Sequence, residues 1–181
     1  MTIPRRLPRP PLAVFAGLFA VGVAALAAPA AGADKQTFLG QHGDWYAYRI
    51  NEDSARTCYM VSKPTRTRGK FTKRGEVVAF VTHRPKEGER DVINFQAGFT
   101  YKANSAISVT VGDKAFSLFS SKDTAWSRNA GDDKAMIKAM IGGTTMDVKG
   151  ITSRGAQIVD TYSLRGFTAA YKKITQACGL K

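Results

Sequence analysis

The sequence contains few of the residues from which catalytic and metal sites are built. It has only two histidines, His42 and His83, and neither has a cysteine or carboxylate nearby at a metal-ligand spacing. No serine stands in a G-x-S-x-G or S-x-x-K motif, and no glycine pattern of a nucleotide-binding loop occurs. We therefore predict a protein that is not an enzyme and has no catalytic residue, metal site or cofactor. The alternative is a hydrolase of envelope or other polysaccharide whose site assembles only in space.

Long hydrophobic runs are absent after residue 33. Before it, three arginines precede an apolar run that ends at the small residues Ala31 and Ala33. This is the three-part layout of a secretory signal peptide. We predict a signal peptide over residues 1–33, cleaved near Ala33, and a periplasmic or secreted mature protein without a transmembrane span. An uncleaved membrane anchor is the alternative, because the run is long enough to cross a bilayer.

Acidic residues are scarce as well. The chain has 14 Asp and Glu against 27 Lys and Arg. Three of the basic residues lie in the leader, so residues 34–181 carry a net charge of about +10. These 148 residues suit one domain. An exported protein with this charge is attracted to anionic surfaces. We predict an anionic envelope or host component as partner, either lipid headgroups, lipopolysaccharide or polysaccharide. A protein partner is a further option, and nucleic acid is not expected.

Cysteine is limited to Cys58 and Cys178. In an oxidising compartment an even number with none left over favours one disulfide. Neither residue has a second cysteine or a histidine at ligand spacing, which disfavours a metal site and a catalytic thiol. A bridge that closes a loop of 120 residues would stabilise the fold by about 5 kcal/mol in the chain-entropy model.

Most of the mature chain has the pattern of short strands separated by turn residues. Residues 76–83 are apolar on both faces and predict a buried central strand. Residues 91–101 alternate between apolar and polar, which predicts a strand with one wet face. Gly112 and Asp113 predict a hairpin turn between two strands. Further strands are expected at 43–50, 57–62, 106–111, 114–119, 144–150 and 156–162.

Two helices are expected among the strands. The first lies within residues 132–143, with Asp132 or Asp133 as its N-cap. The second is expected from Ser163 to Gly179, and steps of three and four residues place its apolar residues on one face; they are Leu164, Phe167, Tyr171, Ile174 and Cys178. The sequence thus predicts a mainly β fold, an antiparallel β-sandwich or flattened barrel with one short internal helix and a C-terminal helix clamped by the disulfide.

Basic residues crowd into residues 63–75, here called the basic segment; they are Lys63, Arg66, Arg68, Lys70, Lys73 and Arg74. The segment has little apolar periodicity and contains Pro64 and Gly69, so it is expected to be an exposed hairpin loop. We predict that these six residues bind the anionic partner. The alternative is a solvated loop that serves only solubility. A further basic residue, Arg154, is interpreted as part of a turn between two strands.

Five short motifs are spread along the mature chain: GDW at 43–45, CYM at 58–60, AW at 125–126, MIGGTTMDVKG at 140–150 and DTYSLRGFTAAYKKITQAC at 160–178. In this order and spacing they resemble the invasion-associated locus B family of exported alphaproteobacterial proteins. Cys58 and Cys178 match the two cysteines of that family. The resemblance implies a periplasmic or envelope-associated single domain, linked in some pathogens to host-cell entry, without a defined enzymatic activity. A purely structural role in envelope integrity is the remaining option.

Overall fold

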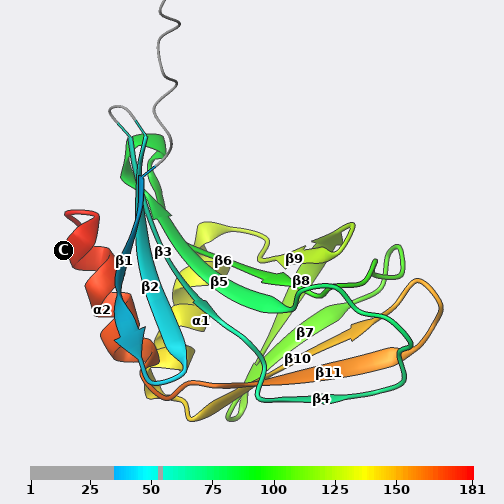
Figure 1. The fold of residues 1–181 in the computed structure, drawn as a ribbon. Coiled ribbons are helices and arrows are strands. Elements are labelled where there is room, and N and C mark those ends of the chain that lie inside the picture. The colour runs from blue at the N-terminus through cyan, green and yellow to red at the C-terminus, as the bar shows by residue number, and fades with distance from the viewer. Residues whose placement is uncertain (1–34, 53–54) are drawn as a thin grey trace, which may run out of the picture. The chain divides into compact units, whose positions relative to one another are not determined.

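The computed structural model describes residues 35–52 and 55–181, so the predicted signal peptide lies outside the described residues. Within these ranges the chain forms strands, two α-helices and one short 3-10 helix (Figure 1). The elements are β1 (Lys35–His42), β2 (Trp45–Glu52), β3 (Ala55–Ser62), β4 (Arg66–Arg68), β5 (Val78–Arg84), η1 (Pro85–Glu87), β6 (Glu89–Gln96), β7 (Ile107–Val111), β8 (Lys114–Ser121), β9 (Thr124–Trp126), α1 (Ala130–Gly142), β10 (Thr145–Ile151), β11 (Gln157–Ser163) and α2 (Phe167–Ala177).

The strands of the described ranges form one antiparallel sheet in the order β1-β2-β3-β5-β6-β9-β8-β7-β10-β11-β4. Strand β8 joins its two halves, because residues 114–118 pair with β7 and residues 119–121 pair with β9. Figure 1 shows β1, β2, β3, β5 and β6 on one side of this junction and β7, β10, β11 and β4 on the other. The predicted mainly β, antiparallel fold with an internal and a C-terminal helix is confirmed. The sheet is not closed into a barrel, and β1 and β4 are its edges.

The core lies where the helices cover one face of the sheet. Helix α2 packs on β1, β2 and β3, and α1 packs on β6. Side chains alternate along β2, so that Trp45 and Ala47 are fully buried. The Trp45 ring meets the edge of Phe167 from α2 at a centroid distance of 5.0 Å, and its Nε1 donates to the carbonyl oxygen of Ser163 at 3.0 Å. No helix among the described residues is long and apolar enough to span a bilayer.

Helix α1 begins at Ala130, earlier in the chain than the sequence pattern predicts. Its N-cap is Asn129, whose Oδ1 accepts a hydrogen bond from the backbone N–H of Asp132 at 3.0 Å. The prediction of Asp132 or Asp133 as the cap was therefore wrong. Asp133 is instead buried, where it accepts hydrogen bonds from the Ile93 N–H at 3.1 Å and from the Ser127 hydroxyl. It links α1 to β6.

Helix α2 begins at Phe167 and not at Ser163, because Ser163 still pairs with Thr145 as the last residue of β11. Gly166 then turns the chain into the helix with a left-handed φ of 87°. The predicted apolar face is confirmed, since Phe167 and Ile174 are fully buried. The predicted strand over residues 91–101 is also shorter, because β6 ends at Gln96.

A disulfide joins Cys58 in β3 to Cys178 at the end of α2, with 5.8 Å between the two Cα atoms. The predicted bridge is confirmed. It fastens the C-terminal end of α2 to β3, the strand that precedes the basic segment.

Candidate functional site

The basic segment is not the free hairpin loop that its composition predicts. Residues 66–68 form the edge strand β4, which pairs with β11 in the register Arg66 with Thr161 and Arg68 with Val159. The Thr65 N–H also donates to the carbonyl oxygen of Thr161 at 2.8 Å. The first half of the segment is therefore docked along the sheet.

Arg74, near the end of the basic segment, points into the protein. Its side chain is only 6% exposed and forms an ion pair with Asp160 of β11. In this pair Nη1 donates to Oδ1 at 2.7 Å, while Nε donates to the carbonyl oxygen of Ala97 at 2.7 Å. The guanidinium also lies over the rings of Phe71 and Phe99, 5.6 Å and 5.0 Å from their centroids. Arg74 was predicted to bind the partner. In the structure its guanidinium is buried, and its pair with Asp160 attaches the end of the basic segment to β11.

The other five predicted residues are exposed, and two of them have acidic neighbours. Lys63 pairs with Glu76 at 3.3 Å and Arg68 with Asp147 at 3.4 Å. Such surface pairs are weak and leave the cations accessible. Arg66, Lys70 and Lys73 are exposed and have no ion-pair partner among the described residues. These three carry the uncompensated charge of the segment.

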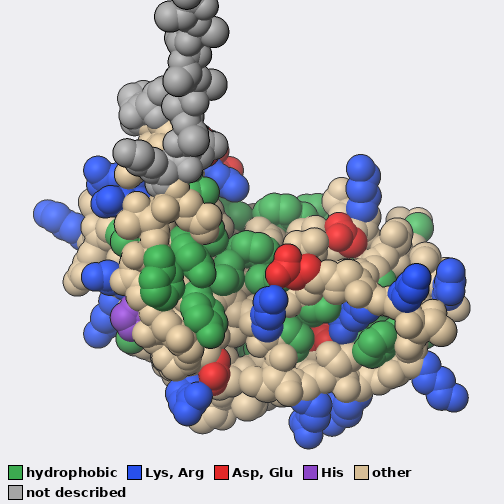
Figure 2. All heavy atoms as spheres, viewed as in Figure 1, with side chains coloured by type: hydrophobic (Ala, Val, Ile, Leu, Met, Phe, Trp, Pro, Cys, Tyr) green, Lys and Arg blue, Asp and Glu red, His purple; other side chains and the backbone are tan. Residues whose placement is uncertain are grey.

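Lys70 and Lys73 line a groove of about 910 Å³, here called the basic groove. Its walls come from residues 69–73, from residues 98–100 after β6 and from the turn between β10 and β11. That turn contributes a third cation, Arg154, which is exposed. No acidic residue is among the described residues that line the groove. Figure 2 shows Lys and Arg side chains gathered along β4 and at the end of the sheet where β10 and β11 meet.

Hydroxyl groups and aromatic rings complete the lining of the basic groove. They are Thr72, Thr100, Thr152 and Ser153, with Phe71 and Phe99. Cations with neighbouring hydroxyl donors bind phosphate, sulfate and carboxylate oxygens. The sequence predicted Lys70 and Lys73 as site residues but missed Arg154. Its only local signal is a basic residue in a turn, because the sheet alone brings residues 69–73 and 152–156 together.

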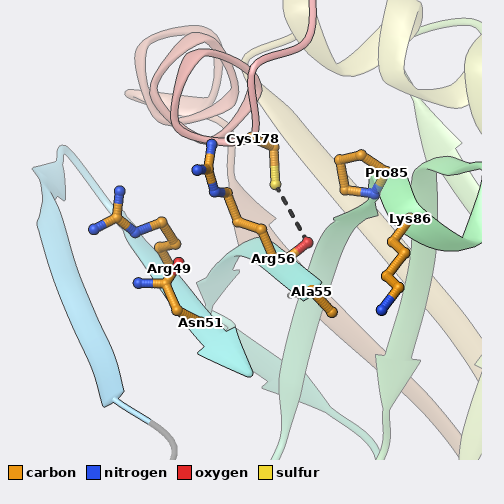
Figure 3. Close-up of a pocket in the computed structure, with 7 residues that line it drawn as sticks. All are labelled: Arg49, Asn51, Ala55, Arg56, Pro85, Lys86 and Cys178. Atoms are coloured by element: carbon orange, nitrogen blue, oxygen red, sulfur yellow. Dashed lines mark hydrogen bonds between the residues drawn. The ribbon is translucent and has the colours of Figure 1, made fainter. Parts of the chain in front are cut away.

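A second basic pocket, of about 480 Å³, lies beside the disulfide (Figure 3). It is lined by Arg49, Asn51, Ala55, Arg56, Pro85, Lys86 and Cys178. The Arg56 guanidinium donates to the carbonyl oxygen of Ala177 at 3.1 Å, and the sulfur of Cys178 lies 3.9 Å from the carbonyl oxygen of Arg56. Arg56 therefore helps to hold the end of α2. The Nε of Arg49 is buried without a hydrogen-bond partner among the described residues.

His83 of β5 is a titratable group that is fully buried. Its Nδ1 accepts a hydrogen bond from the Asp91 N–H at 3.1 Å, so the neutral ring carries its proton on Nε2. Nε2 then donates to the Thr175 hydroxyl at 3.2 Å, and that hydroxyl donates to the carbonyl oxygen of Tyr171 at 2.8 Å. Burial lowers the pKa of His83 and favours this neutral form. In this arrangement Nε2 donates a hydrogen bond to the Thr175 hydroxyl and does not accept one from it.

The remaining candidates are His42 and the side chains that could bind a metal ion. The Nε2 of His42 is buried without a hydrogen-bond partner among the described residues. Over residues 35–52 and 55–181, no three His, Cys, Asp or Glu side chains come together in a way that could hold a metal ion.

An aromatic row crosses the outer face of β1, β2, β3 and β5. Phe38, Tyr48, Tyr59 and Phe80 follow one another with ring centroids 5.4, 5.3 and 6.4 Å apart. A groove of about 770 Å³ runs along the last three of these rings. Figure 2 shows hydrophobic side chains gathered over β2, β3 and β5. Lys63 and Glu76 form an ion pair at its rim. This surface is aromatic and nearly balanced in charge, unlike the basic groove.

Comparison with known proteins identifies the family. Neither the curated proteins nor the solved structures gave a match. A family model described as invasion associated locus B (IalB) protein matches residues 45–175, from the first residue of β2 to the last turn of α2. The match spans more than half of the chain, and it includes the basic segment, the basic groove and Cys58. The chain belongs to the invasion associated locus B family.

Proposed function

We propose that this chain is an exported, non-catalytic protein of the cell envelope that binds an anionic partner in the basic groove. Membership of the invasion associated locus B family supports a role connected with host-cell invasion or envelope integrity. The disulfide between Cys58 and Cys178 supports export, because such bonds persist in oxidising compartments. The observation that carries the proposal is the groove itself, in which three exposed cations meet without an acidic residue among the described lining.

Electrostatics favour the basic groove over the other exposed cations of the basic segment. Lys70, Lys73 and Arg154 converge on one concavity, and like charges in a concave site add their potentials. Lys63 and Arg68 have acidic neighbours, so they add less. A ligand with several negative groups gains from all three groove cations at once, whereas scattered surface lysines act one at a time.

The direction of the hydrogen bonds made by His83 supports a non-catalytic role. His83, Thr175 and Asp91 lie close together, as in a hydrolase triad, but Nε2 of His83 donates to the Thr175 hydroxyl. A general base must accept the hydroxyl proton. The hydroxyl also lies under α2, in a residue that is 8% exposed, where a polymer substrate cannot reach it. The three residues therefore serve to attach α2 to the sheet.

Retention on immobilised heparin tests the proposal. The variant K70Q/K73Q/R154Q removes the groove cations, and the matched control K134Q/K138Q/K172Q removes three exposed cations from the helices. Each cation near an anionic surface contributes about 1 kcal/mol, so the groove variant should bind roughly a hundredfold more weakly at low salt. The control should elute close to the wild type. Equal losses in both variants would mean that net charge alone governs retention.

A search for turnover tests the non-catalytic part. Hydrolysis of an envelope polysaccharide by the wild type, with loss of that activity in Thr175→Val, would contradict it. The expected result is no turnover by either protein.

A further inference from the structure

We infer that the anionic partner is a lipid surface, and that Phe71 enters it while Lys70, Lys73 and Arg154 contact lipid phosphates. This inference rests on the proposed function and names the chemistry of its partner. It begins from Phe71, a large apolar side chain that is 49% exposed in the middle of the basic segment.

The position of Phe71 matches what a membrane interface offers. Lys70 precedes it, Lys73 follows two residues later, and Arg154 lies across the same groove. An anionic bilayer presents phosphate charge above an apolar layer, and proteins bind it by combining basic side chains with an inserted aromatic one. A soluble acidic polysaccharide would neutralise the three cations but leave the exposed half of Phe71 in water. An anionic bilayer therefore satisfies the charge of the three cations and the apolar surface of Phe71 together.

The protein holds this aromatic tip in place from both sides. On one side β4 is paired with β11. On the other, Gly75 donates its N–H to the carbonyl oxygen of Gly98 at 2.8 Å. Between these anchors the Arg74 guanidinium lies 5.6 Å from the centre of the Phe71 ring and is itself fixed by Asp160. Phe71 is thus presented by a short connection with fixed ends, which limits the entropy lost on insertion.

Co-sedimentation with lipid vesicles tests the inference. The exported protein should bind vesicles of phosphatidylcholine and phosphatidylglycerol, and it should not bind vesicles of phosphatidylcholine alone. Phe71→Ser should weaken vesicle binding about tenfold, because half of a phenylalanine side chain is no longer buried. Its retention on heparin should be unchanged. The matched control is Phe119→Ser, which removes a similarly exposed ring, 43%, from β8 and should bind vesicles like the wild type.

Fluorescence of the variant Phe71→Trp reports insertion directly. Its emission should shift to shorter wavelength on addition of anionic vesicles and should be quenched by brominated lipid chains. Heparin should cause no such shift. Wild-type protein gives the background from its native tryptophans, one of which, Trp45, is fully buried.

The outcomes separate this inference from the proposed function. If the groove variant loses heparin retention but the wild type ignores anionic vesicles, the partner is a soluble polyanion and the inference is overturned. If vesicles bind but Phe71→Ser binds equally well, or Phe119→Ser loses as much, Phe71 has no special part and the inference is again overturned. If neither heparin nor vesicles depend on the groove cations, the proposed function fails too.

Discussion

Arg74, at the end of the basic segment, and Asp160, in β11, form an ion pair in which both side chains are almost completely buried, at 6% and 7% exposure. They are 86 residues apart in the sequence. Asp160 also accepts a hydrogen bond from the Thr67 hydroxyl of β4 at 2.7 Å. One carboxylate therefore holds both β4 and the end of the basic segment, and this attachment fixes the positions of the exposed cations between Thr67 and Arg74.

Asp160→Asn should destabilise the protein strongly. The substitution keeps the shape of the side chain but leaves the buried Arg74 guanidinium without a counter-charge, which costs about 3–5 kcal/mol. Urea unfolding followed by circular dichroism measures the change. Glu76→Gln is the matched control, because its pair with Lys63 is exposed at 61% and 74%, and it should cost less than about 1 kcal/mol. A similar small effect for Asp160→Asn would show that the buried pair does not stabilise the fold.

Removal of the disulfide should lower stability by about 2–5 kcal/mol. The bridge closes a loop of 120 residues, so its loss frees most of the unfolded chain. Unfolding of the wild type should shift with a reducing agent, whereas Cys58→Ala/Cys178→Ala should be less stable and insensitive to it. Mass analysis of the exported protein without reduction should give two hydrogens fewer than the reduced form. Free thiols at both positions would contradict the bridge.

Local sequence patterns predicted the parts of the fold that depend on local order. The steps of three and four residues gave the correct buried face of α2, because Phe167 and Ile174 must face the same way on any helix. Apolar residues on both faces of 76–83 predicted the central strand, and β5 is buried on both faces. The disulfide followed from the count of cysteines and the export signal.

Edge strands were missed because their own residues do not specify them. Strand β4 has the sequence Arg-Thr-Arg and extends only because β11 offers it backbone partners. Strand β1 was missed for the same reason, since its strand conformation depends on pairing with β2.

The same limit applies to the candidate site. Lys70 and Lys73 could be predicted from the density of charge around them. Arg154 enters the basic groove through the pairing of β10 with β11. The burial of Arg74 depends on a carboxylate 86 residues away in the sequence, so it cannot be predicted from the residues around Arg74.

Gly98→Ala should loosen the end of the basic segment. Gly98 has a left-handed φ of 68°, and an added Cβ would lie 2.6 Å from the carbonyl oxygen of Gly75. Gly88→Ala is the control, since Gly88 has a similar φ of 72° and nothing within 4 Å of an added Cβ. Both should lose about 1 kcal/mol from backbone strain, and Gly98→Ala should lose clearly more in urea unfolding. Equal losses would mean that the contact with Gly75 relaxes without cost.

The buried histidine should make stability depend on pH. Burial lowers the pKa of His83 in the folded protein below its ordinary value of 6.5, with Arg90 acting in the same direction and Asp91 against it. The unfolded chain therefore binds more protons between the folded pKa and 6.5, so stability is greatest above 6.5 and falls as the pH decreases through this window. The free energy of unfolding in urea, measured from about pH 7 to pH 5, should fall less steeply in His83→Gln than in the wild type.

The free energy of unfolding of the wild type minus that of His83→Gln isolates the contribution of His83, because the other titratable groups are common to both proteins. Asp133 is one of them. Burial raises its pKa above 3.8, so its protonation stabilises the folded protein as the pH falls. In a single curve this gain partly cancels the loss of stability caused by His83. Subtracting the two curves removes this contribution. The difference in free energy of unfolding between wild type and His83→Gln should rise with pH between the folded pKa of His83 and 6.5, and it should be flat above and below this window. Parallel curves would mean that His83 titrates alike in the folded and unfolded chains, in spite of its burial under α2.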